Sequence, residues 1–143
     1  GKVLFYEAGP NYSNSSSILP FNPIAKLYNK KLQTSSTYEV ISYSLQDLLE
    51  KVIEQDVVKE FNLIYMDVQG AEYQVIQNSG NSLKSIDYVY TEVNHVKLYE
   101  GTELFSAFNR LMEKKHFELI DHIPLIKSDG AQSNALYRNL LTT

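Results

Sequence analysis

The chain has 143 residues, a formal net charge of −4 at pH 7, 43% hydrophobic residues and 21% charged residues. This length suits one domain with a buried core, and the ordinary composition excludes a disordered chain. The negative charge, with no Lys or Arg run longer than a pair, argues against a surface that binds nucleic acid. The absence of cysteine excludes disulfides, thiolate zinc sites and a cysteine nucleophile.

No apolar run approaches the roughly 18 residues that span a bilayer, and no charged-then-apolar leader opens the sequence. We therefore expect a soluble, cytoplasmic protein without a membrane partner. Because the chain begins at Gly1 without a methionine, we also expect that it is a fragment of a longer chain.

The N-terminal part of the chain predicts two strands separated by loop. Lys2 to Glu7 is rich in β-forming residues and ends at a Gly-Pro pair, which breaks a strand. The polar and proline-containing residues that follow, as far as Thr37, predict mostly loop with one turn of helix around Ile24 to Tyr28. Tyr38 to Tyr43 is the second expected strand.

A helix is expected directly after the second strand. Ser44 and Asp47 have the spacing of a capping pair, with a hydroxyl at the cap and an acid three residues later. Apolar residues then recur at helical spacing, which predicts that one face of the helix packs on a sheet: Leu45, Leu48, Leu49, Val52 and Ile53.

The middle of the chain predicts a strand, a tight turn, a helix and a second strand. Leu63 to Met66 does not alternate with polar residues, as expected of a strand buried on both faces in the middle of a parallel sheet. Gly70 permits a sharp turn, and the helix that follows is expected to end at Ser79-Gly80. Ile86 to Val93 is the next strand, which completes a right-handed βαβ unit.

An acidic residue lies at the end of each strand of this unit. Because parallel strands end at the same edge of a sheet and lie about 4.8 Å apart, we expect Asp67 and Glu92 to converge on one crevice. Either carboxylate could act as a general base or orient a hydroxyl. The alternatives are structural, since Asp67 could cap the next helix and Glu92 could pair with a basic or backbone partner.

The C-terminal part predicts a helix and a hairpin. After Gly101, apolar residues at helical spacing are expected to belong to the core: Leu104, Phe105, Phe108, Leu111 and Met112. Phe117 to Ile123 and Ala135 to Arg138 predict two strands, joined by a loop with the turn signal Ser128-Asp-Gly130. We therefore expect an antiparallel hairpin beside the parallel strands.

Several short motifs, in this order across roughly residues 40 to 140, resemble the C-terminal half of the FkbM-type S-adenosylmethionine-dependent methyltransferases: Asp67-Val-Gln-Gly-Ala-Glu72, Val75-Ile76, Ser79-Gly80, Tyr90-Thr-Glu-Val-Asn94 and Leu98-Tyr-Glu-Gly101. The resemblance implies a class I methyltransferase-like (Rossmann-like) α/β sheet with helices on its faces and a C-terminal antiparallel hairpin. It also implies S-adenosylmethionine as cofactor and, as acceptor, a hydroxyl on a small molecule or glycan such as a sugar or a polyketide.

Within this reading, the candidate catalytic residues are Asp67, Glu92 and His95, and the candidate acceptor-binding residues are Gln69, Glu72, Asn94 and Tyr99. His95 has an unperturbed pKa near neutrality but is equally an exposed loop residue. Glu72 falls in the first turn of a helix, where a negative charge is stabilised without any catalytic purpose. Mg²⁺ could bridge Asp67 and Glu92, but two carboxylates alone are weak evidence, and we expect no metal site.

In the family, the donor site belongs to the N-terminal half, and the resemblance implies that this half is absent from the chain. Lys2 to Glu7 is followed by Gly9-Pro10 and not by a glycine-rich turn that opens a helix. Two smaller departures are Ser44-Leu-Gln46 in place of Thr-Leu-Asp, and Tyr65 where the family commonly has Lys. We therefore expect residues 1–143 to form a single domain that is the C-terminal part of a methyltransferase-like domain.

Without the donor-binding strand, the strand at Leu63 to Met66 would have an unpaired apolar edge. We expect it to be covered by a missing N-terminal half, by another copy of the chain, or by the two N-terminal strands in an altered role. Two functions stay open: the acceptor-side half of an O-methyltransferase, and a catalytically inactive module that binds a sugar or a protein. A metal-dependent glycosyltransferase is a third alternative, weakened by the lack of a D-x-D motif.

Overall fold

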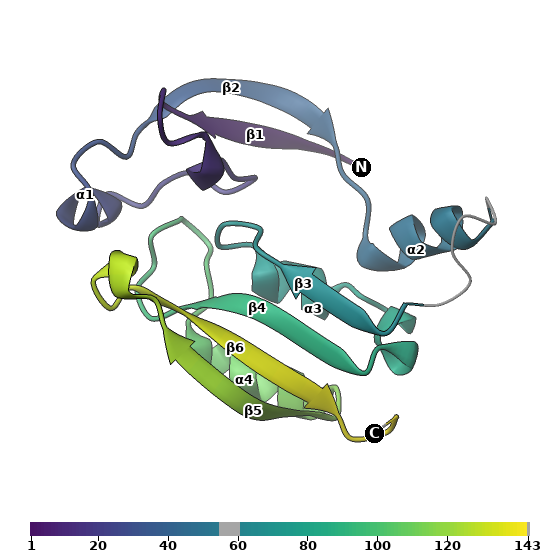
Figure 1. The fold of residues 1–143 in the computed structure, drawn as a ribbon. Helices are drawn as coiled ribbons and strands as arrows, with labels where there is room; N and C mark the ends of the chain where they lie inside the picture. Colours follow the sequence, from purple (N-terminus) through teal and green to yellow (C-terminus); the bar gives the residue numbers. More distant parts are fainter. Residues whose placement is uncertain (55–60, 143) are drawn as a thin grey trace.

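The structure, a computed structural model, describes residues 1–54 and 61–142, and its strands form two sheets (Figure 1). Strand β1 (Lys2–Ala8) pairs antiparallel with β2 (Thr34–Ile41) in a separate two-stranded sheet. The second sheet has the strand order β3-β4-β6-β5, with β3 at Leu63–Met66, β4 at Tyr88–Asn94, β5 at Phe117–Pro124 and β6 at Gln132–Asn139.

The four-stranded sheet is mixed. Strands β3 and β4 are parallel, whereas β6 pairs antiparallel with both β4 and β5. The parallel pair around a helix and the C-terminal antiparallel hairpin are therefore confirmed. In the sheet, β6 lies between β5 and β4. The C-terminal strand therefore pairs with β4, the strand that carries Glu92.

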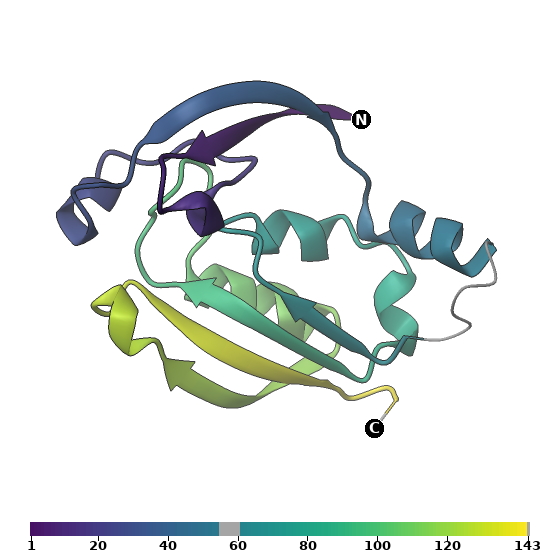
Figure 2. The ribbon, with the colours of Figure 1, turned by 45° about the horizontal axis from the view of Figure 1, so that its top comes forward.

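Helices α3 (Glu72–Gln77) and α4 (Phe105–Lys114) pack on the same face of this sheet (Figure 2). The core lies between them and the sheet, where Ile76, Phe108 and Met112 meet Val89 and Val93 of β4. Alternation along β4 turns its even-numbered residues to the opposite face. In the part of the chain that the structure describes, α3 and α4 thus cover one face of the sheet, and helices on its other face stay a prediction.

Strand β3 is an edge strand with one open face, so the prediction that it is buried on both faces is wrong. Its Leu63 and Tyr65 side chains are 54% and 72% exposed. Within the described residues, β3 pairs only with β4, which leaves the unpaired edge that the sequence predicted. Strands β1 and β2 pair with each other and do not extend the sheet at this edge. That a longer chain or a second copy of the chain covers this edge of β3 stays a prediction.

The N-terminal elements differ from the sequence prediction mainly in their bounds. Helix α1 (Ala25–Tyr28) lies where a helical turn was expected, and a 3-10 turn, η1 (Ser13–Ser15), interrupts the polar loop before it. Strand β2 begins at Thr34, although Thr34 to Thr37 was expected to be loop. The pairing of Ser36 and Thr37 with Glu7 and Tyr6 explains the difference, because β1 supplies the strand partner that local propensity does not reveal.

Helix α2 (Leu45–Glu54) has the expected cap, since the Asp47 N–H donates to Ser44 Oγ at 3.1 Å. The helix contacts a 3-10 turn, η2 (Ser82–Ser85), and its Leu45 packs against the core. Its Leu48 is exposed, so α2 does not cover the sheet as expected.

Helix α3 ends at Gln77, three residues before Gly80, where the sequence predicted the end of the helix. No helix in the described residues has the length and apolar character that a membrane span requires.

Candidate functional site

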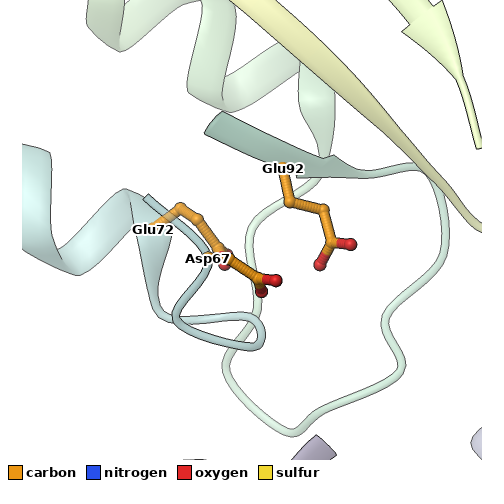
Figure 3. Close-up of side chains that lie close together, drawn as sticks. All are labelled: Asp67, Glu72 and Glu92. Atoms are coloured by element: carbon orange, nitrogen blue, oxygen red, sulfur yellow. The ribbon is translucent and has the colours of Figure 1, made fainter. Parts of the chain in front are cut away.

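The parallel register of β3 and β4 brings three carboxylates together. Met66 lies opposite Thr91, so the next residues, Asp67 and Glu92, emerge side by side at the strand ends. Glu72, in the first turn of α3, is the third, and one oxygen from each of the three lies within 4.8 Å of the others. Figure 3 shows Asp67 and Glu72 extending together toward the space into which Glu92 points.

Glu72 holds the turn between β3 and α3. Its buried carboxylate accepts hydrogen bonds from the N–H groups of Val68 at 3.1 Å and Gly70 at 3.2 Å, and from Asn94 Nδ2 at 3.3 Å. Burial raises the pKa of Glu72, and its hydrogen bonds to backbone N–H groups oppose that shift. These contacts give Glu72 and Asn94 a role in shaping the site, while direct contact with an acceptor stays a prediction.

Gly70 is required at this turn for two reasons. Its φ of +95° lies in the left-handed region, and a Cβ at this position would lie 2.5 Å from Thr102 Oγ1 and 2.8 Å from Tyr99 Cδ2. Thr102 Oγ1 also donates to the Gly70 carbonyl at 3.2 Å. The loop after β4 therefore packs directly against the turn that carries Asp67.

Asp67 is exposed and is oriented by Gln69. The Gln69 Nε2 donates to Asp67 Oδ1, and Gln69 Oε1 accepts a hydrogen bond of 2.8 Å from the Tyr99 hydroxyl. Tyr99 is only 3% exposed, and burial, followed by the charge of Glu92, raises its pKa. Tyr99 thus anchors Gln69, and Gln69 holds Asp67. Their predicted contact with an acceptor remains to be tested.

Glu92 is the most strongly perturbed acid of the cluster. It is 9% exposed, and burial raises its pKa to about 8, with further contributions from the negative charges of Asp67 and Glu72. The Gln132 Nε2 donates to Glu92 Oε2 at 2.6 Å and to Asn94 Oδ1 at 3.2 Å. Glu92 can therefore gain or lose a proton close to neutral pH, in a position fixed by an amide from β6.

The structure does not bring His95 to the carboxylates. Alternation along β4 directs Glu92 and Asn94 to the open face and His95 to the helix face. There the His95 Nε2 lies 2.5 Å from Ser133 Oγ, which is also 2.6 Å from His122 Nε2. Phe105 at the start of α4 stacks on the His122 ring and meets the His95 ring edge-on. The geometry therefore gives no support to the prediction that His95 is a base acting beside Asp67 and Glu92.

Gln132 is the site residue that the sequence analysis missed. It lies opposite Asn94 in the β4–β6 ladder, and its side chain touches two predicted site residues. Neither its residue type nor its neighbours signal a site. Only the pairing of β4 with β6 places it beside Glu92, which is 40 residues away in the sequence.

Three carboxylates of this kind could hold a hard cation such as Mg²⁺. However, Glu72 already accepts three hydrogen bonds, so its oxygens are largely committed to the turn. Asp67 and Glu92 are then the two remaining ligands. Two carboxylates alone are weak evidence for a metal site, in the structure as in the sequence.

Residues 1–119 match the methyltransferase FkbM domain family, and the chain belongs to this family. One curated relative is the 2-O-methyltransferase NoeI of Sinorhizobium fredii (strain NBRC 101917 / NGR234), which is 35% identical over 82 residues. The aligned segment is 57% of this chain and 31% of the relative, so the chain corresponds to about a third of that protein's length. No solved structure matches the chain significantly.

Proposed function

We propose that this chain forms the acceptor side of an S-adenosylmethionine-dependent O-methyltransferase domain with a class I, Rossmann-like fold. We further propose that its acceptor is a hydroxyl of a sugar or a related metabolite. Membership of the FkbM family supports methyl transfer, and the 2-O-methyltransferase relative supports oxygen as the acceptor atom. The observation that carries the proposal is the convergence of Asp67 and Glu92 at neighbouring strand ends.

Glu92 is the proposed general base. Its pKa of about 8 lies close to a physiological working pH, which suits a group that takes a proton from a hydroxyl. Asp67, held by Gln69, is proposed to orient that hydroxyl by accepting its hydrogen bond. Alignment in such a displacement supplies up to about 7–11 kcal/mol in favourable systems. A positioned base adds about 10²- to 10⁴-fold.

S-adenosylmethionine, when bound, supplies an electrophilic methyl group. The described residues do not fit a donor site of the family's kind. Strand β1 is followed by Gly9-Pro10, where a donor site has a glycine-rich turn opening a helix, and β1 pairs with β2 and not with β3. The proposal therefore assigns only the acceptor side to these residues, with donor binding left to additional polypeptide at the β3 edge.

Isothermal titration with S-adenosylmethionine tests the proposal, on this chain and on a longer parent chain. Binding by the longer chain alone is the expected result. If neither chain binds the donor, the methyltransferase proposal fails. The alternative is then a catalytically inactive, methyltransferase-derived module that binds a sugar or a protein. It is favoured by the absence of a glycine-rich turn after β1 in the described residues.

A further inference from the structure

A pocket of about 500 Å³ opens beside Glu92 on the side of the C-terminal hairpin. It is lined by Glu92 of β4, Gln132 of β6 and residues 124–128 of the β5–β6 connection. Its volume lies within the range typical of small-molecule sites. Of the carboxylate cluster and the predicted acceptor-binding residues, Glu92 is the one that lines this pocket.

One part of the lining is an apolar surface held in a fixed position. Leu125 and Ile126 belong to it, and Ile126, in the 3-10 turn η3 (Ile126–Ser128), is 97% exposed. The turn is secured by Ser128, whose Oγ donates to the Leu125 carbonyl at 2.7 Å and accepts from the Gln132 N–H at 3.1 Å. A single exposed isoleucine is ordinary, but this one lines a pocket and belongs to a hydrogen-bonded turn.

The other part of the lining is polar: it includes Lys127 and presents hydrogen-bond acceptors. Both amide hydrogens of Gln132 are committed, one to Glu92 and one to Asn94. Its Oε1, and the second oxygen of Glu92, have no hydrogen-bond partner among residues 1–54 and 61–142. The pocket therefore sets Gln132 Oε1, and the second Glu92 oxygen, which accepts hydrogen bonds when the carboxyl is ionised, beside an apolar patch. Such a combination is complementary to a ligand with hydroxyl groups on its edge and C–H groups on its face.

We propose that this pocket binds the acceptor, and that the acceptor is a pyranose ring. Its C–H face lies on Leu125 and Ile126, and one of its hydroxyls reaches Glu92, with Gln132 Oε1 accepting from a neighbouring hydroxyl. This inference rests on the proposed function for the role of Glu92 as base. The pocket supplies the substrate class, because a linear polyol offers the same hydroxyls without a rigid C–H face.

Saturation-transfer NMR on this chain tests the inference, with methyl β-D-glucopyranoside and methyl β-D-galactopyranoside as probes and sorbitol as the linear control. We expect transfer to at least one pyranoside, strongest at the ring C–H groups, and at least several-fold weaker transfer to sorbitol. Transfer to neither pyranoside, or equal transfer to sorbitol, would overturn the inference.

A matched pair of variants locates the binding. Ile126→Ser removes the apolar contact in the pocket, whereas Ile123→Ser changes an isoleucine that is 50% exposed on the same hairpin but outside the pocket. Since both side chains are exposed, the fold should survive, which circular dichroism checks. We expect Ile126→Ser to weaken pyranoside transfer several-fold and Ile123→Ser to leave it unchanged. Equal effects would place the sugar elsewhere.

The donor titration separates this inference from the proposed function. If pyranosides bind but no form of the chain binds S-adenosylmethionine, the pocket stands and the methyltransferase role fails. If the longer chain binds the donor and no pyranoside binds, the pocket inference alone fails.

Discussion

Glu72 accepts a hydrogen bond from the N–H of Gly70 at 3.2 Å and so closes the turn on which Asp67 is carried. The same oxygen accepts from Val68, and the second oxygen accepts from Asn94 on the neighbouring strand. One buried carboxylate therefore joins the end of β3, the start of α3 and the end of β4. Glu72 therefore holds the three elements that shape the site in place.

We expect Glu72→Ala to destabilise the fold, because three donors lose their acceptor at a buried position. Each buried donor left unpaired costs about 1–3 kcal/mol. Urea unfolding measures the change. Glu100→Ala, at an exposed acid on the nearby loop, is the control and should change the free energy of unfolding little. Equal stability of the two variants would show that the turn does not depend on Glu72.

The raised pKa of Glu92 predicts a pH dependence of stability. The folded state keeps a proton on Glu92 up to about pH 8, whereas the unfolded chain releases it near the ordinary glutamate pKa of 4.5. Between these values the folded state binds more protons, so the free energy of unfolding falls as the pH rises through this window. At about 1.4 kcal/mol per pKa unit, the fall is of the order of a few kcal/mol.

The test compares wild type with Glu92→Gln, which cannot titrate. Urea unfolding of both proteins at pH 5 and pH 8 should show a loss of stability for wild type that the variant lacks. Other titrating groups contribute equally to both proteins and cancel in the difference. Parallel pH profiles would mean that the Glu92 pKa is ordinary.

In a form that transfers methyl groups, Asp67→Asn and Glu92→Gln should each lower turnover. A loss of about 10²- to 10⁴-fold is expected for Glu92→Gln, the size of a general-base contribution. Donor affinity should stay nearly unchanged, since neither residue is assigned to the donor. Steady-state kinetics measure the turnover, and donor titration measures the donor affinity. Asp121→Asn on β5 serves as a control outside the site.

The same kinetics give a pH test of the base. A carboxylate acts as a base only when ionised, so wild-type turnover should rise with pH toward a plateau above about pH 8. Glu92→Gln should lose this ascending limb. Unchanged turnover and an unchanged pH profile in the variant would eliminate Glu92 as the base.

Gly70→Ala should be far more destabilising than Gly130→Ala. Both glycines have positive φ, +95° and +79°, so each alanine bears a backbone cost of about 1–2 kcal/mol. Only at Gly70 does the new Cβ also collide with Thr102 and Tyr99, since at Gly130 no atom lies within 4 Å. Thermal unfolding of the two variants measures the difference. Equal melting temperatures would contradict the close packing at Gly70.

The cluster of His95, His122 and Ser133 on the helix face predicts a pH dependence of stability opposite in sign to that of Glu92. His95 is exposed, but partial burial of its ring, and then the nearby His122, lowers its pKa, so the folded state binds its proton less readily than the unfolded chain. Stability should therefore fall as the pH drops below about 6.5, the ordinary histidine value. His95→Asn in a Glu92→Gln background should reduce the fall in Tm between pH 7 and pH 5, and an unchanged fall would refute the assignment.

The sequence predicted the part of the site that depends on local pattern. An apolar run, a glycine turn, a helix and a second strand define a parallel unit, and parallel strands end at one edge. The convergence of Asp67 and Glu92 followed from this alone and is found in the structure. The antiparallel hairpin followed in the same way, from two β-rich runs around a turn signal.

The tertiary structure decided which faces are covered and which distant residues meet. The apolar run Leu63 to Met66 predicts a strand, but not that the strand lies at an edge with Tyr65 exposed, because burial depends on where the helices pack. The separation of His95 from the carboxylates follows from strand alternation only once the end of β4 is known. The contact of Gln132 with Glu92 depends on which strand lies beside β4, and that pairing is fixed by packing between residues 40 positions apart.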